Sequence, residues 1–345
     1  DANLTITTGG GNGNISFGAT LKGDTTTDSK FSDVSLTSGT GTVSLNTIQD
    51  DIKDVTVSSG TANVTLAGNI TLEDSGVLDI TGNVLAAKNT LAIDTTNGAA
   101  SAGGNVTITG KLDSVTSDRD VDITTGAGTT KITGNIGTVR KLNSLDINST
   151  NSAANTGAIT LEGDIGAGAD STTGAGIATT LKLGNTGTDA AITLKGEDIR
   201  TDGAITLYGK TYSIATGSTA LTIVTSDDAV QFLKATGETG NVTLADNKLT
   251  IDTDTTDTTG GAITFEGDII GSNTGGSNVP VDLVLDAATK TLTVLNIGHT
   301  SSTDGTEIND VTLTGATVST NGKINTTANS TDKGTVTING ALSLA

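Results

Sequence analysis

The nine residues GAITLEGDI at 157–165 return almost unchanged as GAITFEGDI at 261–269. Within the first copy the apolar residues Ile159 and Leu161 alternate with polar residues, and a glycine then precedes a second apolar stretch. Alternation with a period of two indicates a short β-strand, and the glycine indicates a bend before the next strand. Upstream, LDIN at 145–148 alternates in the same way and is followed by a loop of small polar residues. The repeating unit is therefore strand, loop, strand, bend, strand.

The same unit can be placed on most of the chain, with starts about 20 to 35 residues apart and with the loops as the most variable parts. A constant strand phrase with variable loops is typical of a solenoid, in which each coil buries its apolar side chains only by stacking on its neighbours. A sandwich of hairpins would need two-residue Asn-Gly or Asp-Gly turns, which are largely missing between the strands. We therefore predict that residues 1–345 form one continuous all-β parallel solenoid of roughly 13 coils, about 60 Å long.

Equivalent positions of the phrases carry branched aliphatic residues, which we expect to point inward in two neighbouring ladders. A narrow interior of this kind explains why aromatic residues make up only 2% of the chain, and Thr and Ser at the alternate positions suit the exposed side of a parallel sheet. The first predicted ladder is Val64, Val106, Ile132, Ile159, Ile192, Val242, Ile263, Val311 and Val336, and the second is Leu66, Ile108, Leu161, Leu194, Leu244, Phe265, Leu313 and Ile338.

Charge and composition exclude several functions. The formal net charge is −20, and the 18 Lys and Arg residues are not clustered as phosphate binding requires, so nucleic acid is not an expected partner. No run approaches the roughly 18 apolar residues of a membrane-spanning helix, and no signal segment opens the chain, so we place any export signal outside it. The absence of cysteine fits an extracellular surface.

The coil unit resembles the repeats of filamentous haemagglutinin-type exported adhesins and of related autotransporter passengers. The resemblance is carried by LDINSTNSAANTGAITLEGDI at 145–165 and LTIDTDTTDTTGGAITFEGDI at 249–269, and it extends over nearly all of the chain. It implies a single-stranded, right-handed parallel β-helix at the cell surface, acting in attachment, aggregation and biofilm formation. The amino-terminal secretion cap and the carboxy-terminal translocator of these families are absent, so the chain is either an interior segment of a longer polypeptide or related by architecture alone.

Acidic residues offer candidate catalytic and metal sites. Some parallel β-helix enzymes act on polysaccharides with clustered acids, but the pair Glu162 and Asp164 lies 104 residues from the equivalent pair at 266 and 268. Four coils, or about 19 Å, separate the pairs, too far for one acid/base site, so solvated faces are the favoured interpretation. DTDTTDTTG at 252–260 suggests a calcium loop, but its acids are in the wrong register for a helix-loop-helix site.

We therefore predict no catalytic residue and no dedicated cofactor, with calcium bound weakly at the acidic surface. The lone His299, in a loop rich in Ser and Thr, is interpreted as an ordinary loop residue rather than as part of a Ser/His/Asp arrangement. The weak metal candidates are Asp252, Asp254 and Asp257.

The stretch 205–240 departs from the pattern. It contains both tyrosines of the chain, and its AVQFLKA run suggests one short helical turn. We interpret it as a lateral insertion or irregular coil that packs its aromatics on the rod; the alternative is a recognition patch, because aromatic rings stack on sugars and bury well at interfaces. The residues of this candidate patch are Tyr208, Tyr212 and Phe232.

Glycosylation is a further hypothesis, because Asn-x-Ser/Thr occurs repeatedly. The candidate acceptors are Asn63, Asn105 and Asn241, each followed by Val and Thr.

These observations favour a non-catalytic extracellular structural or adhesive rod, a segment of a large surface adhesin or matrix protein whose partners are the rest of a longer chain, surface glycans or neighbouring cells. The alternative is a self-assembling subunit of a filament, sheath or surface layer, in which coils at the two ends stack head to tail. A polysaccharide-acting enzyme is a third and weaker interpretation.

Overall fold

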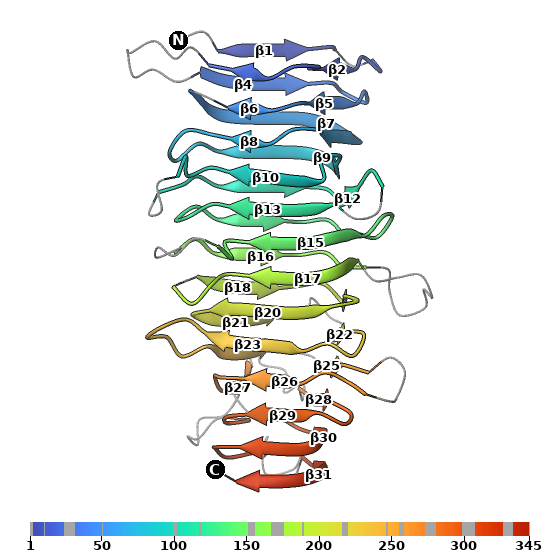
Figure 1. The fold of residues 1–345 in the computed structure, drawn as a ribbon, viewed down its shortest axis with the longest axis vertical. Coiled ribbons are helices and arrows are strands. Elements are labelled where there is room, and N and C mark those ends of the chain that lie inside the picture. Colours follow the sequence, from blue (N-terminus) through green and yellow to red (C-terminus); the bar gives the residue numbers. More distant parts are fainter. Residues whose placement is uncertain are drawn as a thin grey trace.

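The structure, a computed structural model, describes residues 3–9, 11–23, 32–49, 51–98, 102–116, 119–150, 156–166, 176–187, 190–215, 220–245, 248–254, 259–272, 281–298, 308–326 and 334–344. The described residues form β-strands and no helix, and the strands of successive coils pair in parallel. Figure 1 shows them stacked along one long axis, with the described part of the chain running from β1 at one end to β31 at the other. The prediction of a parallel β-solenoid is confirmed.

Each coil contributes to three faces, because its backbone bends twice between strands. β7 (Ile52–Leu66) and β9 (Leu78–Ala86) continue from face 1 into face 2, and β30 (Val311–Thr320) and β31 (Val336–Leu344) continue from face 2 into face 3. The other strands of face 1 are β1 (Leu4–Thr7), β4 (Ser32–Thr37), β11 (Val106–Thr109), β14 (Thr130–Ile132), β16 (Ile159–Leu161), β18 (Ala191–Leu194), β21 (Thr211–Ala215), β24 (Asn241–Ala245) and β27 (Ile269–Ser272). Those of face 2 are β2 (Ile15–Ser16), β5 (Val43–Leu45), β12 (Leu112–Ser114), β19 (Asp198–Arg200), β22 (Leu221–Val224), β25 (Leu249–Asp252) and β28 (Leu283–Asp286). Those of face 3 are β3 (Leu21–Lys22), β6 (Ile48–Gln49), β8 (Ile70–Thr71), β10 (Thr90–Asp94), β13 (Asp120–Thr124), β15 (Leu142–Ile147), β17 (Ile177–Leu183), β20 (Ala204–Gly209), β23 (Val230–Lys234), β26 (Ile263–Phe265) and β29 (Thr291–Val294).

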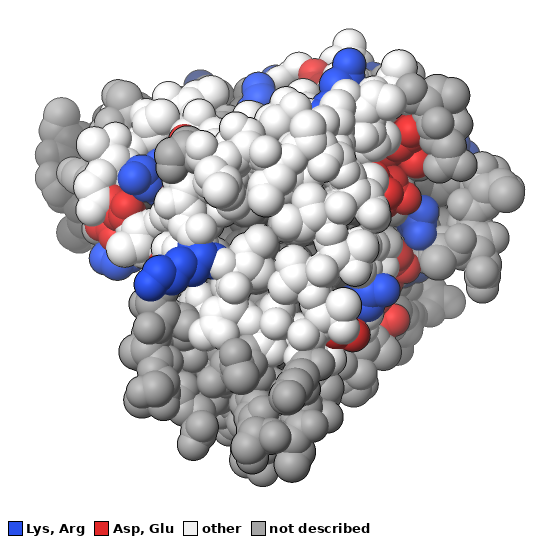
Figure 2. Space-filling view, turned by 90° about the horizontal axis from the view of Figure 1, so that it is seen from below, with Lys and Arg blue, Asp and Glu red and all other residues white. Residues whose placement is uncertain are grey.

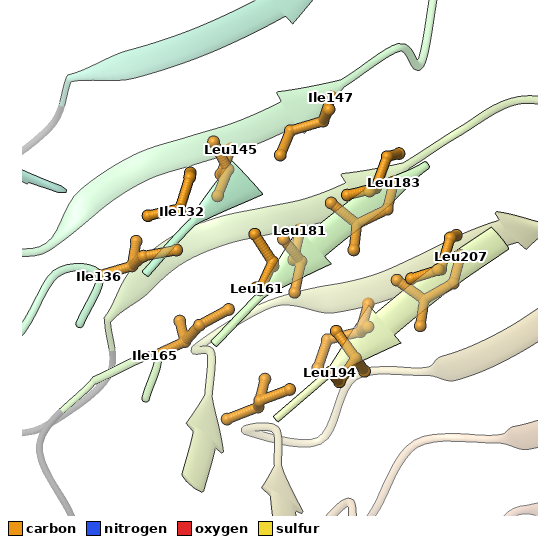
Figure 3. Packing of buried hydrophobic residues seen from close by; sticks show 14 of the residues in the cluster. Ile132, Ile136, Leu145, Ile147, Leu161, Ile165, Leu181, Leu183, Leu194 and Leu207 are labelled. Atoms are coloured by element: carbon orange, nitrogen blue, oxygen red, sulfur yellow. The ribbon is translucent and has the colours of Figure 1, made fainter. Parts of the chain in front are cut away.

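The core lies between the three faces and consists of aliphatic ladders with one residue per coil. Figure 3 shows Ile and Leu side chains from several successive coils converging in this interior. Each side chain is covered by its own coil and by the coils on either side, so no coil is stable alone. The ladder of face 2 is Ile15, Val43, Val64, Val84, Leu112, Ile136, Ile165, Ile199, Ile223, Ile251, Leu285, Leu313 and Ile338.

The inward orientation of the predicted ladder residues is confirmed; Val336, in the last described coil, keeps the register of Val311 but is 41% exposed because no described coil covers it. Their grouping into two ladders is wrong. Val64 lies on face 2, Ile159 on face 1 and Ile263 on face 3. The repeated phrase itself passes from face 1 to face 2 at 157–165 and from face 3 to face 1 at 261–269. All three faces need the same alternation and the same bend. The phrase therefore predicts a corner between two strands, but it does not predict which two faces that corner joins.

The glycines of these bends stack on one another between coils. A Cβ added to Gly134 would lie 2.3 Å from the backbone of Gly110, and one added to Gly163 would lie 2.4 Å from the backbone of Gly134. Gly196 stands in the same relation to Gly163, with a contact of 2.5 Å. No other residue allows the backbones of successive coils to approach so closely at this corner.

The stretch 205–240 is built into the regular ladders. β20 pairs with β17 and β23, and β21 pairs with β18 and β24, so these described strands continue faces 3 and 1. The run predicted as a helical turn is strand β23. Among the described residues no helix has the length and apolar character needed to cross a membrane.

Candidate functional site

Two of the three aromatics of the candidate recognition patch lie in the core. Tyr212 and Phe232 are 1% and 0% exposed, because both side chains occupy inward positions of the ladders. Phe232 stacks on Phe265 of the next coil with ring centroids 4.7 Å apart and packs edge-on against Tyr212 at 5.2 Å. The Tyr212 hydroxyl lies within donor reach of the carbonyl oxygens of Leu207, at 2.9 Å, and of Leu233. The expectation that aromatics do not fit the interior is wrong for this segment.

Tyr208, the remaining member of that patch, is half-buried on the outer side of face 3. It borders a shallow groove of about 260 Å³ lined by Ser149, Lys182, Gly184, Asn185, Thr186, Thr206 and Tyr208. Next to this groove Asp122, Asp146 and Lys182 follow one another on three successive coils. Burial raises the pKa of both carboxyl groups; the neighbouring Asp120 also raises that of Asp122, while Lys182 opposes the rise at Asp146. The lining of the groove therefore includes one cationic side chain, Lys182, and one aromatic side chain, Tyr208.

The calcium candidates do not form a metal centre in the part of the chain that the structure describes. The Asp252 carboxylate accepts a hydrogen bond from the Asp254 backbone N–H at 2.9 Å, which closes a local turn. Asp257 and His299 lie outside the described residues. No group of three or more His, Cys, Asp or Glu side chains placed to hold a metal occurs among the described residues. Weak calcium binding at the surface stays a prediction.

The two acidic pairs of the repeated phrase fasten neighbouring coils to each other. Glu162 lies between Lys195 and Lys131, at 2.7 and 3.3 Å, and these contacts, led by the hydrogen bond from Lys195, hold its pKa below the ordinary value. Asp164 accepts backbone N–H groups of the next coil at 2.7 and 3.2 Å. The pair of Glu266 and Asp268 has corresponding roles but lies at a different corner. These four carboxylates therefore hold neighbouring coils together through ion pairs and hydrogen bonds.

The candidate glycosylation residues precede or occupy exposed parts of strands. Asn63 is exposed in β7. The side-chain oxygen of Asn105 accepts the Thr129 N–H at 2.9 Å, and that of Asn241 accepts the Asp268 N–H at 3.1 Å, so both side chains bridge to the following coil. Glycosylation of these residues stays a prediction.

The outer side of face 1 carries a feature beyond the solvated sheet surface that its Thr and Ser content predicts. Two columns of hydroxyl-bearing residues run along it through six successive coils, each strand contributing positions i and i+2. Asp79 and Lys131 are the two exceptions in these columns. We call this set the hydroxyl face; it consists of Thr5, Thr7, Ser35, Thr37, Thr56, Ser58, Thr81, Thr107, Thr109 and Thr133.

The hydroxyl face could have been found from the sequence by aligning the tripeptides TIT, SLT, TVS, DIT, TIT and KIT at 5–7, 35–37, 56–58, 79–81, 107–109 and 131–133. The alignment requires the coil register, which the local pattern does not resolve.

No protein-family model, no curated protein and no solved structure shows a match to this chain.

Proposed function

We propose that the chain is a non-catalytic extracellular structural and adhesive rod, a segment of a large surface adhesin or matrix protein. The observation that carries this proposal is the uninterrupted core. Buried aliphatic residues continue on all three faces from Val34 to Val318, so the described coils share a single packed interior. A rod of this kind suits the task of holding other regions at a fixed distance from a cell.

The roles of the acidic residues support a non-catalytic assignment. Asp164, Glu266 and Asp268 accept hydrogen bonds that join one coil to another, and Glu162 is held by two lysines. Carboxylates committed in this way stabilise the stack. An assay on a panel of acidic polysaccharides provides the direct test, because an enzyme would shorten the polymer and a rod would leave its length unchanged.

The extracellular assignment has its own experiment. Intact cells of the source are treated with a protease that cannot enter them, and the released peptides are identified by mass spectrometry. Peptides of this chain are expected from intact cells under conditions in which a cytoplasmic marker stays protected. Release of the chain only after lysis would contradict the proposal.

The alternative, end-to-end assembly, is favoured by the surface of the last described coil. β31 pairs with β30, and its Leu342 and Leu344 are 50% and 75% exposed. Figure 2, viewed along the long axis from this end, shows a central surface almost without charge, with charged side chains toward the periphery. An open strand edge with exposed apolar side chains accepts another coil, either from a longer polypeptide or from a second copy.

Analytical ultracentrifugation of the 345-residue chain over increasing concentration separates these cases. Growth into long particles that is abolished by Leu342→Lys with Leu344→Lys supports assembly between copies. A chain that stays monomeric at high concentration contradicts the filament alternative.

A further inference from the structure

The hydroxyl face is a flat, regular array of groups that the protein itself does not use. Its ten side chains are all exposed or half-buried. Within the described residues none of their hydroxyl groups forms a hydrogen bond with another protein group. Buried hydroxyls elsewhere behave differently: those of Ser38, Thr95 and Thr253 donate to backbone carbonyls at corners. The hydroxyl face therefore presents unused donors and acceptors to the surroundings.

The array is periodic in two directions. Thr7 pairs with Thr37, and Ser58 with Thr81, in an unbroken parallel register, so the columns run straight along the axis. Hydroxyls repeat about every 4.8 Å from coil to coil and about every 6.6 Å between the columns, which is the spacing of residues i and i+2 in a strand. Six coils give columns about 24 Å long. In Figure 1 the successive strands keep nearly the same direction, so the array is not distorted by a strong twist.

The array is also rigid. The central residue of each tripeptide points into the core, and Leu36, Ile80 and Ile108 are 0% exposed. From the second coil on, each outer side chain thus has a buried residue beside it in its own strand. Threonine adds a stiff χ1 torsion, which keeps hydroxyl and methyl groups in defined positions. The conformational entropy of these side chains is lost when the chain folds. A ligand that matches the array therefore binds without further loss of protein entropy.

The composition of the hydroxyl face selects the class of ligand. Its two columns contain only two charged residues, Asp79 and Lys131, which are of opposite sign, so a lattice of ions is a poor match. It has no aromatic side chain, which a polysaccharide needs for stacking, and no large apolar anchor, which a protein partner needs. The matching ligand is extended, uncharged and periodic, and it both donates and accepts hydrogen bonds, as threonine hydroxyls do.

A crystalline surface of water meets all of these conditions. The array offers hydroxyl donors and acceptors at regular intervals in two directions, as the surface of a crystal of water does, and threonine adds a methyl group beside each hydroxyl. We propose that the hydroxyl face binds ice. The inference goes beyond the proposed rod function and does not depend on it, because adsorption to ice requires only the folded stack.

The test uses the whole chain, labelled with a fluorophore, in a growing ice hemisphere. The wild-type protein is expected to be incorporated into the ice, while an inert protein of similar charge is excluded. The variant Thr37→Tyr with Thr81→Tyr places bulky side chains in the middle of the array while keeping residues that favour strands. Its incorporation is expected to fall by about tenfold or more.

The matched control is Thr264→Tyr, an outward position of face 3, which is expected to be incorporated like wild type. A second variant, Thr37→Val with Thr81→Val, keeps the shape and removes hydroxyls, so it tests the chemistry with minimal risk to folding; circular dichroism verifies the fold of each protein. Exclusion of the folded wild-type chain from ice overturns the proposal. Equal incorporation of wild type and the Tyr variant, or retention on crystalline cellulose without retention on ice, overturns it as well.

Discussion

A methyl group added at Gly163 should destabilise the solenoid, although alanine in place of glycine usually stabilises a chain. Alanine restricts the unfolded state and contributes about 0.4–1 kcal/mol where the native backbone accepts it. At Gly163 the new Cβ would lie 2.4 Å from the carbonyl carbon of Gly134 and 2.6 Å from the Asn135 nitrogen. Both atoms belong to the backbone of the neighbouring coil, so no flexible side chain can give way.

The magnitude follows from the separation that the two coils would have to adopt. Ordinary van der Waals contact lies at 3.4–4 Å, so the coils must part locally by about 1 Å. The hydrogen bonds from Glu162 N–H to Ile132, at 2.9 Å, and from Asp164 N–H to Asn135, at 3.2 Å, flank this contact. Weakening both, together with overpacking of about 1–3 kcal/mol, gives a local destabilisation of about 2–4 kcal/mol after the gain from the unfolded state.

Hydrogen exchange measured peptide by peptide is the appropriate assay, because a long stack of coils need not unfold as one unit. Gly163→Ala is expected to lose protection in the coils around residues 130–166 and to leave distant coils unchanged. The control is Gly18→Ala, where a Cβ meets nothing within 4 Å and protection should be unchanged or slightly increased. Unchanged or increased protection in Gly163→Ala would refute the argument that corner glycines are required by contact between coils.

Three further predictions concern titrating and buried polar groups. Burial raises the pKa of the Asp146 carboxyl group, so its ionised form destabilises the folded chain as pH rises through the raised value. Asp146→Asn should therefore increase the urea midpoint of unfolding at pH 7 and not at pH 3. The effect at Glu162 has the opposite sign, because Lys195 lowers the pKa of its carboxyl group and the ionised form stabilises the folded chain. This stabilisation is lost as pH falls through the lowered value, so Glu162→Gln should decrease the urea midpoint at pH 7 and not at pH 3. Tyr212→Phe removes the donor to buried carbonyls and should cost about 1 kcal/mol in denaturant unfolding, and a midpoint equal to wild type would show that this hydrogen bond contributes nothing.

The sequence by itself determined the local structure of this protein. Alternation at Ile159 and Leu161 fixed which side chains point inward, and Gly163 fixed a bend, because both signals act within a few residues. The repetition of the unit also required stacking, since one short coil cannot bury its own apolar side chains. The fold class followed from these facts alone.

The tertiary structure decided which face each strand belongs to. Faces 1, 2 and 3 use the same alternation, so the copies at 157–165 and 261–269 look equivalent in sequence while occupying different corners. Loop lengths and pairing between coils set that assignment, and they act over 20 to 36 residues, beyond the reach of a local pattern. The same limit explains the errors at Tyr212 and Phe232, because Tyr212 packs on Phe232 and Phe232 in turn stacks on Phe265 one coil away. The hydroxyl face exists only once the register brings its tripeptides side by side, because a column of side chains is a property of the stack and not of any single coil.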